Sequence, residues 1–232
     1  MGGLSPSQKG FILKKLAIVG AQELTRDNAP FDNKDYEIWT ISNWANADWC
    51  KRVDAVIEIH TPDVYKNHPL DSEYWSWLQK TKKTIYMLDL HPSISNAKQY
   101  PLDKVSELSL SVHGNPTNNF GSSVDYALAL AIQLGYKEVE VYGVEMAESS
   151  EYKNQQSSFA FWVGVAAGRG ISIDLKCTDK LFNKPLYGRF PDTTKKLHEY
   201  TSGLKSQKLE NTKQGHMLDG ALQILNQLIE DE

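Results

Sequence analysis

The stretch that most constrains the fold is residues 120–146, FGSSVDYALALAIQLGYKEVEVYGVEM, where a helical pattern runs directly into a strand pattern. Apolar residues recur at helical spacing in its first part, at Ala127, Leu128, Ala131, Ile132 and Leu134. Its second part, residues 139–144, is a short apolar run rich in β-branched residues. Glycine favours the left-handed conformation that ends many helices, so Gly135 predicts a helix that ends at Leu134 or Gly135. A buried strand then follows.

The turn Gly121-Ser122-Ser123 precedes this helix. The first N–H groups of a helix have no partner within the helix, and small residues leave room for a ligand to approach them. The turn is therefore a candidate cradle for an anion or a phosphate. The alternative is that Ser122 or Ser123 only caps the helix.

Further short apolar runs predict strands at residues 16–19, 36–41, 55–59, 84–88 and 171–175. Alternation of strands with helices indicates an α/β fold, a Rossmann-like three-layer domain with a mainly parallel sheet and C-terminal helices. We expect this domain to span residues 1–190. Residues 191–232 form a helical extension whose apolar stripe packs on the domain or on a partner subunit. Residues 100–105 are expected to form a loop.

Polar residues follow the predicted strands, and the carboxyl edge of a parallel sheet is where such folds bind ligands. Asn43 is a candidate for binding a base or ribose edge, with a turn-forming role as the alternative. His60 is a ligand contact or a general base, or else a structural histidine. His113 lies in a polar connection beside the Gly121 turn. Glu145 is a catalytic carboxylate or an acceptor that holds the next loop.

Composition limits the partners. The formal net charge of −4 at pH 7 gives no global field for nucleic acid, which would need a local basic patch. The chain has two cysteines, Cys50 and Cys177, far apart and without ligand spacing, so we expect free thiols in a reducing compartment and no metal site. We also expect a cytoplasmic protein without a membrane segment, because no apolar run is long enough to span a bilayer.

Four segments carry a family resemblance: LAIVGAQELT, WTISNWA, AVIEIHTP and residues 120–146. Together they resemble the nucleotide-binding half of the bacterial family-42-type sialyltransferases and the related hydroxymethylpterin diphosphokinase-type Rossmann proteins. The EYKNQ segment and the SFAFWVGVAAGRGI stretch also resemble a group of uncharacterised bacteriophage proteins of similar length. The resemblance spans residues 16–187. It implies that the protein is phage-encoded and works in the host cytoplasm.

The resemblance also implies a nucleotide site. In the sialyltransferases the cytidine nucleotide is held by the loop after the first strand, the Asn after the second, and the small-residue turn before the central helix. The matching residues are Gly20, Gln22, Asn43, Thr61, Gly121, Ser122 and Ser123. The first loop departs from the family pattern Gly-Asn-Gly-Pro-Ser, because Gly20-Ala21-Gln22-Glu23-Leu24 lacks the second glycine and carries a carboxylate that would repel a phosphate. No histidine lies between Glu145 and His198 to match the family's base, so His60, His113 and Glu145 are the catalytic candidates.

These features favour a nucleotide-sugar-dependent glycosyltransferase whose donor is a CMP- or UDP-linked sugar and whose acceptor is a nucleotide, a nucleic acid or a glycan. Two other hypotheses stay open. One is a non-catalytic protein that binds a small nucleotide ligand as a signal, and the other is a magnesium-dependent pyrophosphokinase. Whether the chain is an enzyme, and whether it forms a homo-oligomer, also stays open at the level of sequence.

Overall fold

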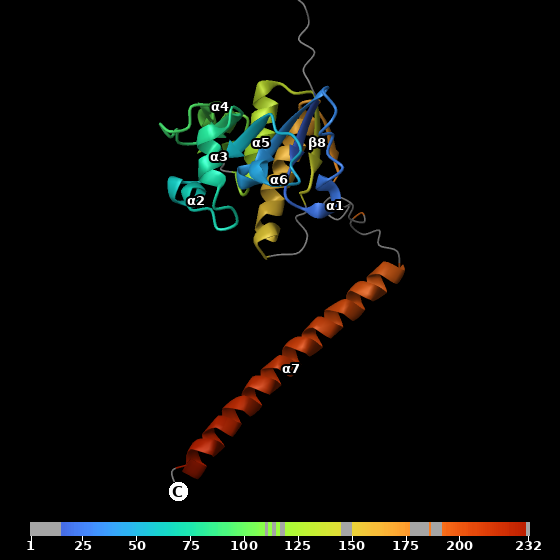
Figure 1. Ribbon diagram of the computed structural model, residues 1–232. Coiled ribbons are helices and arrows are strands. Elements are labelled where there is room, and N and C mark those ends of the chain that lie inside the picture. The colour runs from blue at the N-terminus through green and yellow to red at the C-terminus, as the bar shows by residue number, and fades with distance from the viewer. Residues whose placement is uncertain are drawn as a thin grey trace, which may run out of the picture. The chain divides into compact units, whose positions relative to one another are not determined.

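The computed structural model describes residues 15–109, 111–112, 115–116, 119–144, 150–176, 186 and 192–230 (Figure 1). The chain divides into two compact units, Met1–Phe182 and Asn183–Glu232. No helix in the described ranges is both long enough and apolar enough to cross a membrane.

The first unit contains the sheet and the helices that cover it. Its strands are β1 (Lys15–Val19), β2 (Tyr36–Ile41), β3 (Ala55–Glu58), β4 (Thr84–Met87), β5 (Ala97–Gln99), β6 (Ser111–Val112), β7 (Asn115–Pro116), β8 (Glu138–Tyr142) and β9 (Ser172–Leu175). Its helices are α1 (Glu23–Arg26), the 3₁₀ helix η1 (Ser42–Asn46), α2 (Pro62–Lys66), α3 (Tyr74–Lys80), α4 (Leu102–Ser106), α5 (Ser123–Leu134) and α6 (Ser150–Gly168).

Seven strands form one sheet in the order β5-β4-β3-β2-β1-β8-β9, and every neighbouring pair is parallel. β6 and β7 form a separate antiparallel pair. The chain enters the large sheet at β1, runs outward to β5, and then crosses to β8 on the other side of β1. The order of strands therefore reverses between β1 and β8, which is where open α/β sheets bind ligands outside the carboxyl ends of their strands.

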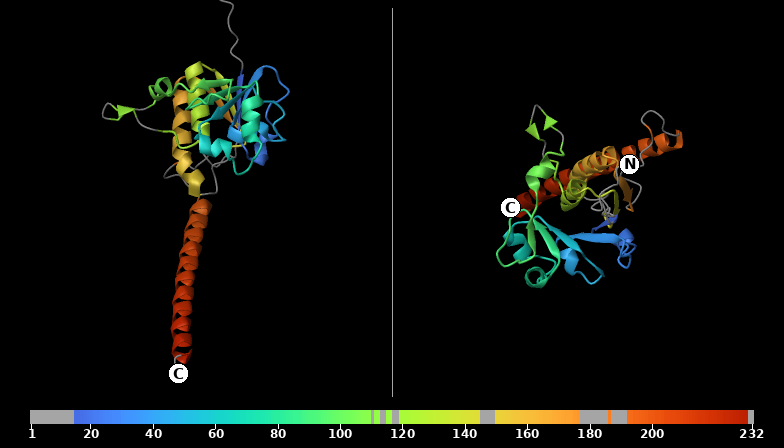
Figure 2. Two further views of the ribbon diagram at one scale, coloured as in Figure 1. Left: turned by 60° about the vertical axis from the view of Figure 1, so that its left-hand side comes forward. Right: turned by 90° about the horizontal axis from the view of Figure 1, so that it is seen from above.

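Side chains on both faces of the sheet are buried. In β1, Leu16 and Ile18 pack in the core that α5 and α6 cover, and Ala17 and Val19 pack in the core on the opposite face. Further along that opposite face, α2 and α3 cover Val56 of β3. Figure 2 shows the sheet between these helices. The continuous apolar runs of the sequence are thus strands of a three-layer α/β domain, as the sequence predicts.

Most predicted elements are confirmed. β2 has the predicted bounds, and α5 ends at Leu134 because Gly135 follows with φ = 84°. The prediction of a loop over residues 100–105 was wrong, because α4 begins directly after Pro101. One turn of helix forms there because Val105 is fully buried against the core that α5 covers. β5 was not predicted, because only backbone pairing to β4 defines this short strand.

The second unit consists of α7 (Asp192–Glu230). The apolar side chains described in it are exposed, among them Leu197, Leu204, Met217 and Leu218. Packing of this helix on the domain or on a partner subunit stays a prediction.

The carboxyl ends of β1 and β8 touch through two glycines. A Cβ atom on Gly20 would lie 2.5 Å from the carbonyl oxygen of Gly143, and a Cβ atom on Gly143 would lie 2.5 Å from the carbonyl oxygen of Gly20. Gly143 also has φ = 61°, which side-chain-bearing residues rarely adopt. This close approach sets the spacing of the two strands on either side of the switch point.

Replacement of Gly20 by alanine is expected to lower the free energy of unfolding by about 1–3 kcal/mol, because the added methyl group has no room. Urea unfolding followed by tryptophan fluorescence measures the change. Gly164→Ala is the matched control, because that glycine lies on an exposed face of α6 with nothing within 4 Å of an added Cβ. This control should stabilise the protein by about 0.5–1 kcal/mol. Equal destabilisation by both variants would contradict the contact explanation.

Candidate functional site

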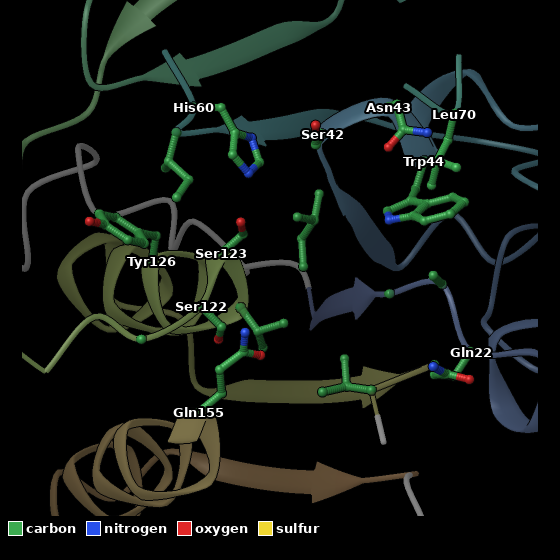
Figure 3. A pocket seen from close by; sticks show the side chains of 18 of the residues that line it. Gln22, Ser42, Asn43, Trp44, His60, Leu70, Ser122, Ser123, Tyr126 and Gln155 are labelled. Carbon is green, nitrogen blue, oxygen red and sulfur yellow. The ribbon is translucent and has the colours of Figure 1, made fainter. Parts of the chain in front are cut away.

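A cavity of about 620 Å³ lies at the carboxyl edge of the sheet, at the switch point (Figure 3). Its walls come from the segments that follow β1, β2, β3 and β8 and from the start of α5, with Gln155 of α6 at one side. The structure brings together most of the residues that the sequence singled out, namely Gly20, Gln22, Asn43, His60, Gly121, Ser122 and Ser123.

Three predicted site residues are not in this set. Thr61 does not line the cavity. It is exposed and takes the N-cap position of α2, where its extended backbone leads into Pro62. His113 and Glu145 lie outside the described residues.

The loop after β1 lines the cavity, but two of its backbone N–H groups already have hydrogen-bond partners. The N–H of Gly20 donates to the carbonyl oxygen of Tyr142 at 2.8 Å, and the N–H of Gln22 donates to that of Gly143 at 3.0 Å. These two N–H groups are therefore engaged by β8. The absence of a side chain at Gly20 is explained by the contact with Gly143, and the Gln22 side chain stands at the cavity wall (Figure 3).

The start of α5 is both capped and partly open. Ser122 and Asp125 form a capping box, in which Asp125 Oδ2 accepts the N–H groups of Gly121 and Ser122, each at 2.8 Å. The N–H groups of Ser123 and Val124 have no hydrogen-bond partner within the described part of the chain. Asp125 therefore satisfies the first two N–H groups of this turn, the next two are left for another acceptor, and the binding of an anion there stays a prediction.

The carboxyl group of Asp125 lies beside this candidate anion site, at the start of α5. Its side chain is fully buried, and Ser158 Oγ also donates to Oδ2 at 2.8 Å. Burial raises the pKa of Asp125 to about 6. Hydrogen bonds from Ser158 and from the N–H groups of Ser122 and Gly121 act in the opposite direction and only partly offset the effect of burial. Because ionised Asp125 repels an anion at the same helix end, we expect the anion site to strengthen as the pH falls through about 6.

Asn43 is a buried amide that faces the cavity. The residue is 5% exposed, it lines the cavity, and its side chain has no hydrogen-bond partner among the described residues. The amide atoms are accessible from the cavity, so a ligand bound there can form hydrogen bonds with them. The preceding Ser42 has φ = 49°, the only positive φ at a non-glycine position in the described ranges.

His60 follows β3 and is held by a carboxylate that the sequence analysis missed. Glu58 Oε1 lies 2.7 Å from His60 Nδ1 and accepts the backbone N–H of His60 at 3.0 Å. Because a carboxylate only accepts, Nδ1 carries the proton, and the ring points its other nitrogen, Nε2, into the cavity (Figure 3). Glu58 was overlooked because it lies within the predicted strand 55–59. A carboxylate inside an apolar strand was the signal that could have revealed it.

The pair shifts both pKa values. Burial alone would raise the pKa of Glu58, but hydrogen bonds from His60 and Tyr74 outweigh it, so the pKa lies below its ordinary value. The hydrogen bond to Glu58 raises the pKa of His60, against the opposing effect of burial. An imidazole oriented by a buried carboxylate is an arrangement suited to general acid–base chemistry.

The remaining walls are largely aromatic and apolar and include Trp44, Leu70 and Tyr126, and a second histidine, His68, also lines the cavity. No Lys or Arg is among the lining residues that the structure describes. Within the same ranges, no group of three or more His, Cys, Asp or Glu side chains could hold a metal ion.

No family model and no curated protein matches the chain. Solved structures do. The sialyltransferase CstII from Campylobacter jejuni in complex with cytidine-5'-monophosphate is 16% identical, with 77% of this chain and 88% of that chain covered and a TM-score of 0.47. An α-2,3-sialyltransferase from Campylobacter jejuni in apo form is 15% identical, with 83% and 95% covered and a TM-score of 0.43. The resemblance to bacteriophage proteins and to pterin diphosphokinase-type proteins stays a prediction.

Replacement of Asp125 by asparagine should flatten the pH dependence of stability. The folded-state pKa of about 6 exceeds the ordinary value of 3.8, so the wild type loses this contribution as the pH rises through about 6. The asparagine oxygen can still accept the N–H groups of Gly121 and Ser122. Melting temperatures between pH 5 and 7.5 measure the slope.

The control is Asp63→Asn, which changes an exposed acid in the first turn of α2 and should leave the slope as in the wild type. An unchanged slope in the Asp125 variant would show that Asp125 titrates as it does in the unfolded chain.

Proposed function

We propose that the protein is a glycosyltransferase that uses a nucleotide sugar as donor. The observation that carries the proposal is the pairing, in one cavity at the switch point, of a carboxylate-held histidine with an open helix start. Glycosyl transfer to a hydroxyl group needs a group that takes the proton of the acceptor and a site that stabilises the departing phosphate. His60 and the start of α5 supply these two functions.

The donor nucleotide occupies the part of the cavity bounded by α5 and η1. Its phosphate accepts the N–H groups of Ser123 and Val124, where the helix dipole adds favourable charge. The side chain of Asn43 forms hydrogen bonds to the base or the ribose. Gln22 lies on the same cavity wall and adds a second amide. We propose a CMP- or UDP-linked sugar as the donor.

The proton leaves the acceptor through His60. The acceptor hydroxyl oxygen attacks the anomeric carbon, the bond from that carbon to the phosphate oxygen breaks, and His60 Nε2 takes the hydroxyl proton. Glu58 stabilises the imidazolium that forms, because its carboxylate lies 2.7 Å from Nδ1. The electron pair of the broken bond stays on the phosphate, where the N–H groups at the start of α5 stabilise the added charge.

The first test is a binding and turnover screen. Purified protein is mixed with CMP, UMP, other nucleotides and nucleotide sugars, with and without Mg²⁺, and thermal shift reports binding because a ligand of the native state raises the melting temperature. Release of nucleotide from each bound nucleotide sugar in the presence of sugar acceptors reports transfer. Binding without release under any condition would favour a non-catalytic nucleotide-binding protein. No binding of any nucleotide would overturn the proposal.

Asn43→Ala should weaken binding of the nucleotide identified in the screen by about 3- to 10-fold, the effect of one neutral hydrogen bond. Isothermal titration calorimetry measures the affinity. Asn67→Ala is the control, since Asn67 is exposed, lies outside the cavity, and bonds to the carbonyl oxygen of Asp63. Equal affinities of the wild type and the Asn43 variant would remove this residue from the site.

His60→Gln should reduce transfer by about 10²- to 10⁴-fold and leave nucleotide binding within a few fold. The wild-type rate should rise with pH through the pKa of His60, because only the neutral ring takes a proton. Glu58 raises that pKa, so the acidic limb should lie above the range of an ordinary histidine. A rate that is unaffected by the substitution would show that another group is the base.

A further inference from the structure

We propose that Glu58 is a positioning residue that sets two parts of the site at once, the His60 imidazole and the turn that presents Asn43. The role depends on the proposed function only for its consequence in catalysis. The structural part, that one carboxylate orients both groups, can be tested without any substrate.

The two oxygens of Glu58 have separate tasks. Oε1 accepts hydrogen bonds from the backbone N–H and from the ring Nδ1–H of His60. Oε2 accepts hydrogen bonds from the hydroxyl groups of Ser42 at 2.8 Å and of Tyr74 at 2.7 Å. The carboxylate is fully buried, so these four donors replace the water that it would otherwise bind. One carboxylate therefore holds both His60 and Ser42 in place.

The contact with Ser42 follows from the register of the sheet. β2 and β3 are parallel, with Thr40 opposite Val56 and Ile41 opposite Ile57. One step further along both strands brings Ser42 opposite Glu58. The strand end that carries the carboxylate is thus fixed beside the turn that follows β2.

Ser42 needs this contact because its backbone is unusual. Its φ of 49° lies in the left-handed region, which costs free energy at a residue with a side chain. The hydrogen bond from Ser42 Oγ to Glu58 offsets that cost. The next residue along the chain is Asn43, so the conformation at Ser42 determines where the buried amide stands in the cavity.

Tyr74 anchors the carboxylate from the helical layer. It is fully buried in α3, and its ring is packed against those of Trp77 and His68. Burial raises the pKa of Tyr74 well above its ordinary value, and the charge of Glu58 adds to this, so the hydroxyl stays a donor. The Tyr65 hydroxyl is buried and has a pKa raised by burial and by the charge of Glu58.

A purely structural role for Glu58 is the competing explanation. In that case the carboxylate would only join β2, β3 and α3, and its replacement would lower stability without changing the properties of the imidazole. The two explanations differ in the protonation behaviour of His60, so the decisive readout is the ring itself rather than the melting temperature.

The test is Glu58→Gln, which keeps the shape of the side chain and removes its charge. NMR of ¹⁵N-labelled histidine follows the protonation and the tautomer of His60 in the full chain. We expect the titration midpoint of His60 to fall and the neutral ring to lose its preference for a proton on Nδ1. Wild-type behaviour of His60 in this variant would overturn the proposal.

Tyr74→Phe is the matched control. It removes one donor to Oε2 and leaves both the charge of Glu58 and its contact with His60 in place. The tautomer preference of His60 should stay as in the wild type. If Glu58→Gln does not fold, Glu58→Asp serves instead, because the shorter side chain keeps the charge but cannot reach both His60 and Ser42. Either the tautomer preference of His60 or the turn at Ser42, read by CMP affinity, should then be lost, and wild-type behaviour of both would overturn the proposal.

A second pair of variants tests the turn. Ser42→Ala loses the hydrogen bond and keeps the backbone strain, whereas Ser42→Gly loses the bond but tolerates a positive φ. With CMP as the probe, affinity should fall several-fold for Ser42→Ala and less for Ser42→Gly. An unchanged affinity in Ser42→Ala, together with measurable CMP binding by the wild type, would overturn the link between Glu58 and the turn.

The outcomes separate the two proposals. A shift of the His60 titration in Glu58→Gln, with no nucleotide bound by the wild type, would retain the positioning role and reject the transferase. Sugar transfer by the wild type, with the His60 titration unchanged in Glu58→Gln, would retain the transferase and reject the positioning role. If both hold, kcat of Glu58→Gln should fall at least about tenfold, since part of the general-base contribution is lost.

Discussion

The cost of burying the Glu58 carboxylate organises this edge of the protein. A charge out of water is stable only when hydrogen bonds satisfy it, and the partners here come from three different elements. Ser42 follows β2, His60 follows β3 and Tyr74 belongs to α3. Because these contacts are needed for the carboxylate to be buried, they also fix the loops whose side chains face the cavity. The fold and the site therefore depend on one group.

A second buried carboxylate, Asp125, organises the opposite wall. It holds the turn before α5 and joins that turn to α6 through Ser158. The two acids differ in their donors. Hydrogen bonds from His60 and Tyr74 keep the pKa of Glu58 below its ordinary value, whereas burial raises the pKa of Asp125 to about 6. The carboxylate beneath His60 thus holds its charge to lower pH than an ordinary Glu, and the carboxylate at the start of α5 changes charge near pH 6.

The sequence predicts those parts of the molecule that hydrophobic periodicity and special residues determine. The parallel sheet follows from apolar runs, and the end of α5 follows from Gly135. Periodicity could not reveal α4, whose single turn is stabilised by burial of Val105. It also could not reveal the role of Glu58, because two of its partners, Ser42 and Tyr74, come from other elements of the fold. Asn43 could be singled out by its place after a strand, but its lack of a partner is a property of the folded structure alone.

The charges of the site also suggest how a turnover could end. The described lining has no Lys or Arg, so a phosphate would be held by the N–H groups at the start of α5 and by His60 when its ring is charged. In the proposed reaction, transfer would leave His60 protonated beside the departing nucleotide, and Glu58 would stabilise that state. Loss of this proton to water restores the base and removes the cation from the nucleotide. Ionisation of Asp125 weakens the same phosphate site. In the proposed reaction, deprotonation of His60 would thus both recover the base and favour release of the nucleotide.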